Sequence, residues 1–370
     1  MSIKNISLPN YDNCITNLAC SIQKYFNLNP KHKTIHTLDE VLEKTNPKNV
    51  VVLLFDGMGT NLLKRKLEKE DFLMQHLVTE LTSVAPATTT AATTSMMTGL
   101  NPVEHGWLGW DLYIKPVDKV VTMFMNKVKD TGEIAADYDV SRTYYPYKTI
   151  IQQINEAGEY TAKDFFPFGE DPYTDNDDLT EKIVEECSKE GKKYLYAYLI
   201  HPDSMMHDLG TEAKEVNEYF KEIGEIVKGI ADQLEDTLII VTADHGHLEC
   251  DNILLTEYPD FFETLARTTW IESRCCAFKV KEGKEKEFEN LFEKYFGKDF
   301  ILKTKEEVIE AKLFGDGEEN KLFRDSLGDY LALAITNKDF RYDERTSVLK
   351  SIHAGFTEDE MNIPLILISK

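Results

Sequence analysis

The sequence predicts an α/β fold, with a central, mostly parallel sheet flanked by helices. The first observation is a set of short, continuous apolar runs, which are typical of strands buried on both faces of a parallel sheet. They span residues 50–55, 194–200, 238–242 and 364–369. The second observation is a set of helical patterns between these runs, at residues 61–69, 179–190 and 212–234. Strands that alternate with helices favour a parallel sheet.

The segment 254–327 differs in texture from the rest of the chain. It contains an apolar stretch, a charged helical stretch and a second apolar stretch, at residues 276–280, 285–296 and 300–302. We interpret this segment as a small α+β insertion or cap, and the same pattern also fits an edge of the main sheet. The predicted catalytic domain then consists of residues 1–253 and 328–370.

The charge of the chain limits its partners. It carries 65 Asp and Glu residues against 42 Lys and Arg residues, a formal net charge of -23. Such a surface repels polyanions, so we expect neither an extended nucleic acid nor an anionic membrane as a partner. A small phosphate-ester substrate stays compatible with this charge, because bound cations can reverse the local field.

The cysteines and the apolar segments bear on location. The six cysteines, at positions 14, 20, 187, 250, 275 and 276, form no CxxC pair. We interpret them as reduced thiols and expect a cytoplasmic protein in which His and carboxylate hold any metal. The first twenty residues lack an apolar run of signal-peptide length. No stretch is apolar over the roughly 20 residues that a membrane-spanning helix needs.

Acidic and imidazole side chains stand at the ends of the predicted strands. They are Asp56 after the first run, Asp203 and His207 after the second, Asp244, His245 and His247 after the third, and His353 before the last. Taken singly, an Asp-Gly pair is usually only a turn. Because the carboxyl ends of parallel strands line one crevice, the whole set favours a metal site. Imidazole nitrogen and carboxylate oxygen suit zinc or a similar divalent ion.

A threonine-rich segment, residues 84–100, contains a helical pattern that ends at Gly99. A threonine at a helix N-terminus is commonly only an N-cap. Beside a metal ion, however, a threonine hydroxyl becomes a usable nucleophile, because the ion lowers its pKa. The helix N-terminus would also offer backbone N–H groups to a phosphoryl oxygen.

Five motifs follow one another in a specific order. They are Asp56-Gly57, then Pro86-x-x-Thr89 leading to the Thr-Gly-Leu-x-Pro-x-x-His-Gly segment at residues 98–106, then Asp203-x-x-x-His207, Asp244-His245-Gly246 and His353-x-Gly355. Each motif is weak alone, and the ordered set is specific. From about residue 49 to the end, the chain resembles the type I phosphodiesterase/nucleotide pyrophosphatase family of the alkaline phosphatase superfamily.

The resemblance implies an alkaline-phosphatase-like fold and a hydrolase of phosphate esters. It also implies two divalent metal ions, zinc by preference, with manganese or iron as alternatives. The residues implied for one ion are Asp56, Thr89, Asp244 and His245, and those for the other are Asp203, His207 and His353. Thr89 would be the nucleophile that forms a covalent phosphothreonine, since it stands three residues after Pro86.

The chain departs from the family pattern just after this threonine. In the nucleotide pyrophosphatases the next residues are Phe-Pro-Asn, whereas here they are Thr90, Ala91 and Ala92. A base-stacking ring and a side chain that contacts the phosphoryl oxygen are therefore absent at these positions. Alternatives to a phosphodiesterase are a phosphomonoesterase, a phosphonate or sulfate ester hydrolase, a phosphoryl-transferring mutase and a catalytically impaired metal-binding protein. The residues predicted to contact substrate are Trp107, Trp110, Tyr144, Tyr145 and His247.

Overall fold

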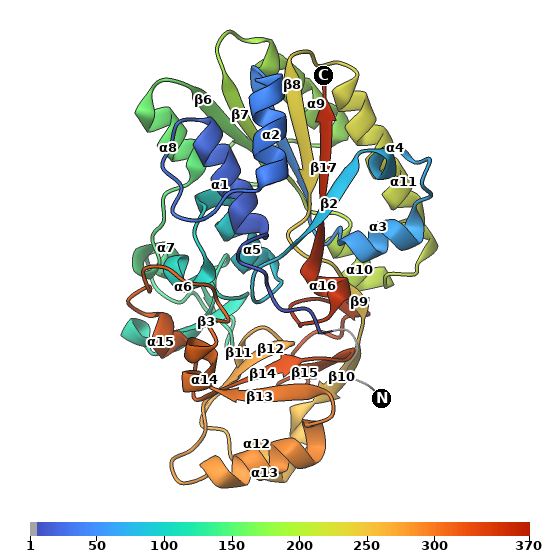
Figure 1. Cartoon of the computed structure of the whole chain (residues 1–370). Helices are drawn as coiled ribbons and strands as arrows, with labels where there is room; N and C mark the ends of the chain where they lie inside the picture. Colours follow the sequence, from blue (N-terminus) through green and yellow to red (C-terminus); the bar gives the residue numbers. More distant parts are fainter. Residues whose placement is uncertain (1–5) are drawn as a thin grey trace.

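The structure is a computed structural model that describes residues 6–370. Its main feature is a six-stranded sheet with the strand order β2-β17-β8-β1-β7-β6 (Figure 1). The strands are β2 (Leu77–Thr82), β17 (Asn362–Ser369), β8 (Thr237–Thr242), β1 (Asn49–Phe55), β7 (Lys193–Leu199) and β6 (Thr161–Phe165). Strands β8, β1 and β7 pair in parallel, as predicted, and β6, which the sequence analysis missed, also pairs in parallel with β7. The prediction on a targeting segment concerns the first twenty residues, of which residues 1–5 lie outside the described part.

Strand β17 differs from the prediction, because it runs antiparallel to both of its neighbours, β8 and β2. Its interior is as buried as that of β1. Burial on both faces produces the same apolar run in either direction, so the pattern could not reveal the orientation. The central sheet is therefore mixed and mostly parallel. The start of β17 lies at the same edge of the sheet as the ends of its parallel neighbours.

Helices pack on the central sheet in two groups (Figure 1). One group contains α1 (Ile15–Tyr25), α2 (His36–Thr45), α5 (Thr89–Thr98) and α8 (Ile150–Ala157). The other contains α3 (Thr60–Lys66), α4 (Phe72–Gln75), α9 (Asn176–Ser188), α10 (Asp203–Leu209) and α11 (Lys214–Ala231). The three predicted helical patterns correspond to α3, α9 and α11. Between residues 6 and 370, no helix combines the length and the apolar character needed to cross a membrane.

A second sheet of seven strands lies below the first in Figure 1, with the order β13-β14-β12-β11-β3-β4-β5. Its strands pair antiparallel. They are β3 (Asp111–Ile114), β4 (Lys119–Thr122), β5 (Lys127–Val128), β11 (Trp270–Ile271), β12 (Cys275–Phe278), β13 (Phe300–Thr304) and β14 (Tyr330–Ala334). Helix α13 (Glu285–Phe296) covers one face with an aromatic core that includes Phe278, Phe292 and Phe340.

The predicted insertion, residues 254–327, supplies only part of this second sheet. It contributes β11, β12, β13 and α13, together with α12 (Pro259–Phe262), α14 (Lys305–Glu310) and α15 (Phe323–Ser326). Strands β3, β4, β5 and β14 come from outside that range. The strands β3 to β5 are two to four residues long, which is too short for a periodic pattern to stand out.

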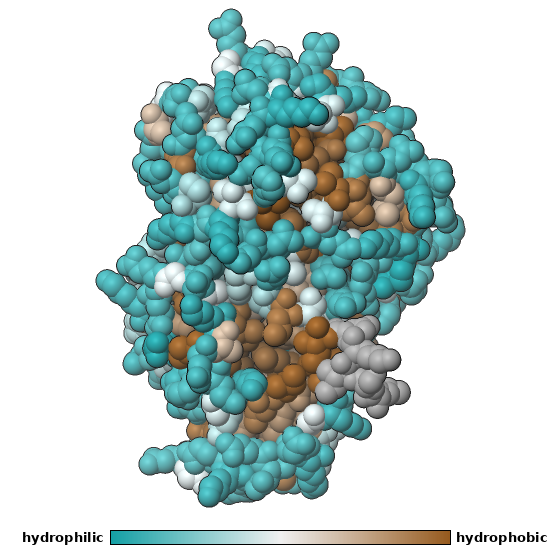
Figure 2. All heavy atoms as spheres, viewed as in Figure 1, coloured by the Kyte–Doolittle hydropathy of each residue, from teal (hydrophilic) through white to brown (hydrophobic). Residues whose placement is uncertain are grey.

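Short elements connect the two sheets. They are α6 (Pro102–His105), α7 (Val140–Tyr144), α16 (Glu358–Met361) and two ribbons, β9 (Leu248–Glu249) with β16 (Ser351–Ile352), and β10 (Asp251–Leu254) with β15 (Lys338–Arg341). Figure 2 shows that the face seen there is mostly hydrophilic, with hydrophobic residues gathered in its hollows. Each sheet has its own hydrophobic core.

A buried ion pair joins the two sheets. Arg274 lies in the turn between β11 and β12, Glu360 lies in α16, and both side chains are fully buried. The guanidinium donates to both carboxylate oxygens of Glu360, from Nε to Oε1 at 2.6 Å and from Nη2 to Oε2 at 2.8 Å. It also donates to the main-chain oxygens of Thr336 and Lys338. All of these bonds are charge-assisted, which makes them stronger than bonds between neutral groups.

Glu360 also holds two loops of the central sheet. Its Oε1 accepts a hydrogen bond from the main-chain N–H of Gly355 at 2.6 Å. Its main-chain oxygen accepts one from the N–H of Gly246 at 2.8 Å. The residue before Gly355, Ala354, adopts φ +81°, a conformation that favours glycine. The bonds to Glu360 therefore fix a loop that would otherwise relax.

We predict that Arg274→Met lowers the free energy of unfolding by about 3–5 kcal/mol, because it leaves the Glu360 charge buried without a partner. Urea denaturation measures this change. Arg324→Met is the matched control, since its pair with Glu319 (2.7 Å) is exposed, and it should cost at most about 1 kcal/mol. Equal losses in the two variants would contradict a stabilising role for the buried pair.

Candidate metal centre

Acidic side chains converge at the carboxyl edge of the central sheet. Asp56 directly follows β1, Asp244 follows β8 and Asp203 opens the helix after β7. These three strands are adjacent and parallel, so their carboxyl ends meet, as the sequence predicted. His353 precedes β17, whose antiparallel direction brings its start to the same edge. The rings of His245 and His353 stack with centroids 3.7 Å apart.

Asp56, Asp244 and His245 form the first cluster, with ligand atoms within 4.8 Å of one another. His245 Nε2 lies 3.2 Å from Asp56 Oδ1 and 3.6 Å from Asp244 Oδ2. Asp244 Oδ1 accepts from the main-chain N–H groups of Gly57 (3.1 Å) and His245 (3.0 Å). Gly57 donates this bond at φ +75°, where a side chain would be strained. Asp244 Oδ2 is buried and has no partner among the described residues.

The electrostatics of this cluster favour a bound cation. Burial and the charge of Asp203 raise the pKa of Asp56, and burial and the charge of Asp56 raise the pKa of Asp244. Burial disfavours the charged imidazole of His245, but the charges of Asp244 and Asp56 raise its pKa to about 10. Clustered buried carboxylates are costly unless a positive charge compensates them. The unpartnered Asp244 oxygen and the mixed N/O donor set fit a divalent metal ion.

Asp203, His207, His247 and His353 form the second cluster. The Nε2 atoms of His247, His207 and His353 lie 2.7, 3.4 and 3.7 Å from Asp203 Oδ1. Burial alone would raise the pKa of Asp203, but these histidines hold it well below its usual range. Four side chains, two from α10 and one each from the loops before β9 and after β16, thus converge on one point beside the first cluster.

Thr89 lies next to the first cluster as the first residue of α5. Its Oγ1 is 3.3 Å from Asp56 Oδ2 and 3.3 Å from His245 Nε2. The neighbouring hydroxyls point elsewhere, since Thr88 Oγ1 donates to Glu272 Oε1 at 2.7 Å and Thr90 Oγ1 is buried. Of these three adjacent threonines, Thr89 is the one whose hydroxyl contacts the cluster.

A cavity of about 480 Å³ opens beside Thr89 and the second cluster, between the two sheets. From the central sheet it is lined by Thr88, Thr89, Asp203, His207 and His353, and from the second sheet and its neighbouring loops it is lined by Trp110, Lys129, Glu272, Asp339 and Tyr342, among others. Of the aromatic residues predicted to contact substrate, Trp110 lines this cavity. Trp107 and Tyr145 are buried in the core of the second sheet. Nε1 of Trp107 donates a hydrogen bond to the main-chain oxygen of Tyr145 at 2.8 Å. Tyr144 lines a separate hollow.

The structure brings two further side chains to the site. Tyr198, inside β7, donates its hydroxyl to Asp56 Oδ2. Glu272 accepts from Thr88 and from the main-chain N–H of Trp110 at 2.8 Å, and burial raises its pKa to about 7. Sequence reasoning missed both, because Tyr198 belongs to a run that reads as core and Glu272 lies in no motif.

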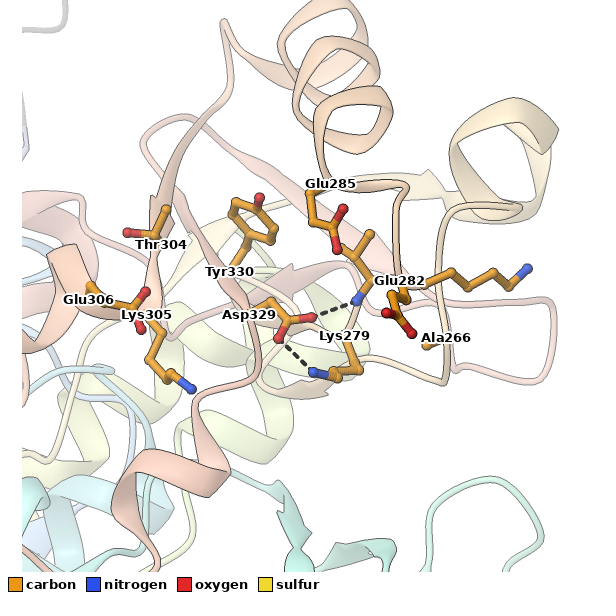
Figure 3. Close-up of a pocket in the computed structure, with 11 residues that line it drawn as sticks. Ala266, Lys279, Glu282, Glu285, Thr304, Lys305, Glu306, Asp329 and Tyr330 are labelled. Carbon is orange, nitrogen blue, oxygen red and sulfur yellow. Dashed lines mark hydrogen bonds and ion pairs between the residues drawn. The ribbon is translucent and has the colours of Figure 1, made fainter.

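A larger hollow of about 770 Å³ lies in the second sheet, away from the clusters (Figure 3). Asp329 is satisfied there by Lys279 at 2.7 Å and by the main-chain N–H of Val280 at 2.9 Å. Its lining contains none of the predicted site residues. The cavity at the sheet edge is therefore the one that serves the clusters.

An α/β sheet whose carboxyl edge carries two His/Asp clusters beside a threonine is typical of hydrolases that use two metal ions. The chain belongs to the type I phosphodiesterase/nucleotide pyrophosphatase family, whose family model matches residues 50–347. It is a hydrolase of that family, as the ordered motifs predicted. No protein with a curated description matches the chain.

Solved structures of similar fold include murine and human ectonucleotide pyrophosphatase/phosphodiesterase 5, both 19% identical in sequence to this chain. The murine structure has a TM-score of 0.68 and covers 87% of this chain and 88% of its own. An inactive murine variant in complex with AMP has a TM-score of 0.67, with 19% identity and 85% and 87% coverage. The human structure has a TM-score of 0.65, with 86% and 87% coverage. These structures confirm the α/β fold.

We predict that chelation destabilises the protein, because it leaves the carboxylates of the two clusters without a cation. An ion supplied at about 100 times its Kd contributes about 3 kcal/mol, so EDTA should lower the melting temperature and zinc should restore it. In Asp244→Asn, which removes one buried charge, the effect of EDTA should be smaller. A melting temperature that changes with neither EDTA nor zinc would contradict the metal centre.

Proposed function

We propose that this protein hydrolyses phosphodiester or nucleotide pyrophosphate bonds, with Thr89 as the nucleophile and two divalent metal ions at the sheet edge. The observation that carries the proposal is the position of Thr89 Oγ1, 3.3 Å from both Asp56 and His245. In this place a hydroxyl faces a cluster of metal-binding type and opens on the cavity. Family membership gives the reaction class.

The two clusters divide the metal-binding residues in the proposal. Asp56, Asp244, His245 and Thr89 would hold one ion, and Asp203, His207 and His353 would hold the other. Bound there, the ions supply positive charge that lowers the pKa of a hydroxyl or water and neutralises the oxygens of the phosphoryl group. Zinc is the proposed ion, with manganese or iron as alternatives, since the donors are imidazole and carboxylate without sulfur.

The reaction is a double displacement at phosphorus. Thr89 Oγ1 loses its proton and attacks phosphorus, the bond from phosphorus to the leaving oxygen breaks, and the leaving oxygen takes up a proton. The phosphothreonine that forms keeps the ester group that remains on phosphorus. A water oxygen then attacks from the side the leaving group has vacated and gives up a proton, the bond from phosphorus to Thr89 Oγ1 breaks, Thr89 Oγ1 regains a proton, and a phosphate monoester is released. Backbone N–H groups at the N-terminus of α5 are suited to bind a phosphoryl oxygen. They would replace the contact that the family's asparagine makes, since this chain has Ala92 at that position.

A phosphodiester is the proposed substrate. The inactive murine variant of similar fold is described in complex with AMP, which supports a nucleotide leaving or transferred group here as well. Trp110 is the aromatic residue positioned to contact such a group, because it lines the cavity and its side chain is partly exposed. No arginine lines the cavity among the described residues, and Lys129, which does line it, is paired with Asp111 at 3.0 Å. The lack of a free cationic side chain among the described lining residues favours a monoanionic diester over a dianionic monoester.

We also propose a cytoplasmic location, because the six cysteines are free thiols.

We predict that Thr89→Ala lowers kcat on a phosphodiester by about a thousandfold or more while folding and metal content stay intact. Thr88→Ala and Thr90→Ala are the matched controls and should be far milder, since neither hydroxyl contacts the first cluster. Mass spectrometry of enzyme quenched during turnover should show, on the peptide that contains Thr89, a phosphoryl group that still carries the remaining ester substituent of the diester. Wild-type rates from Thr89→Ala would exclude this nucleophile.

We further predict a preference among substrates of the zinc-loaded protein. Chromogenic diester, monoester and sulfate ester substrates should be compared at equal concentration, and kcat/KM should be highest for the diester. A protein most active on the monoester or the sulfate ester would replace the diester proposal. Transfer of the phosphoryl group to an added alcohol in place of water would indicate a transferase.

A further inference from the structure

The histidines of the second cluster differ in the bonding of their Nδ1 atoms. His207 Nδ1 lies 2.8 Å from the main-chain oxygen of Ser351, and His353 Nδ1 lies 3.2 Å from that of Ala87. A carbonyl oxygen can only accept, so both Nδ1 atoms carry hydrogen, and in the neutral rings both Nε2 atoms have a free lone pair. This is the tautomer that a metal-binding histidine needs, with its outer N–H held by a carbonyl.

His247 lacks such a bond. Its side chain is fully buried, its Nδ1 has no partner among the described residues, and its Nε2 lies 2.7 Å from Asp203 Oδ1. If Nε2 bound a metal ion, Nδ1 would carry a hydrogen with no acceptor. An ionised carboxylate can only accept a hydrogen bond, and Asp203 Oδ1 lies at hydrogen-bond distance from Nε2. The geometry therefore favours the opposite tautomer, in which Nε2–H donates to Asp203.

We propose that His247 is a positioning residue for Asp203 and is not a fourth ligand of the second metal ion. Its N–H holds Asp203 Oδ1 and turns the carboxylate towards His207 and His353. The inference rests on the proposed function in that it needs a metal ion at this cluster. Three protein ligands also leave a coordination position open, which a catalytic ion requires and a fourth ligand would fill.

The local fold explains how His247 reaches this place. It follows His245 by two residues and directly precedes β9. In the ribbon of β9 with β16, Leu248 pairs with Ile352, which brings His247 beside His353 with ring centroids 5.2 Å apart. The same ribbon provides Ser351, whose oxygen orients His207. The ribbon of β9 with β16 thus fixes the tautomer of His207 and also positions His247 beside Asp203.

The test uses His247→Gln and His247→Leu, with His207→Gln as the ligand control. A glutamine amide N–H can occupy the place of His Nε2 and donate to Asp203, whereas leucine cannot. The readouts are zinc content per chain, zinc affinity by chelator competition, and the absorption spectrum of the Co²⁺-loaded protein, which reports the ligands. Circular dichroism checks the fold of each variant.

We expect His247→Gln to hold two ions with a Co²⁺ spectrum like that of the wild type. His247→Leu should bind the second ion about 10- to 100-fold more weakly. His207→Gln should lose affinity and change the spectrum, since it lacks a ligand. If His247→Gln also changes the spectrum and loses the ion, His247 is a ligand and the proposal is overturned.

Two other outcomes are separable. If His247→Leu binds zinc as tightly as the wild type, His247 has no positioning role and the proposal fails while the proposed function stands. If the wild type binds no more metal than His207→Gln does, there is no ion at the second cluster and the two-metal function fails. Should His247→Leu not fold, the spectrum of His247→Gln still decides between ligand and positioning residue.

Discussion

The burial of three carboxylates at one edge of the central sheet is the constraint on which the rest of the site depends. Asp56, Asp203 and Asp244 are mostly or fully withdrawn from water, and this burial, together with their mutual repulsion, raises the pKa of Asp56 and Asp244. The groups around these carboxylates offset their negative charge. Tyr198 and the Gly57 N–H donate to it, and four histidines surround it. What these donors leave free is one oxygen of Asp244 and the Nε2 atoms of His207 and His353, a set suited to cations.

The direction of the last strand completes this edge. Strands β1, β7 and β8 run in the same direction, so the acidic residues that follow them lie at this edge. Strand β17 runs in the opposite direction, so His353, which precedes it, lies at the same edge. If β17 ran parallel to these strands, its preceding loop would lie at the far edge of the sheet. The mixed sheet is thus a requirement of the second cluster. The second sheet supplies the opposite wall of the cavity, with Trp110 and Glu272.

Much of this arrangement could be predicted from the sequence, where local chemistry is strong. Continuous apolar runs gave β1, β7 and β8, Gly99 marked the end of α5, and acids after strands indicated the edge where they meet. The orientation of β17 could not be predicted, because an apolar run is the same in both directions. Strands as short as β5 have no period to detect. The fates of Trp107, buried, and Trp110, exposed to the cavity, depend on contacts between segments far apart in the chain.

The bonds of Glu360 have a consequence for the spacing of the two metal positions. Gly246 follows His245 of the first cluster, Gly355 lies two residues after His353 of the second, and both N–H groups are bonded to this one residue. The separation between the clusters is therefore set by main chain and by a buried charge outside either of them. A displacement of the second sheet would act through Arg274 on both loops at once. The loops of the two clusters are thus tied to one residue, and neither could shift relative to the other without disturbing the bonds of Glu360.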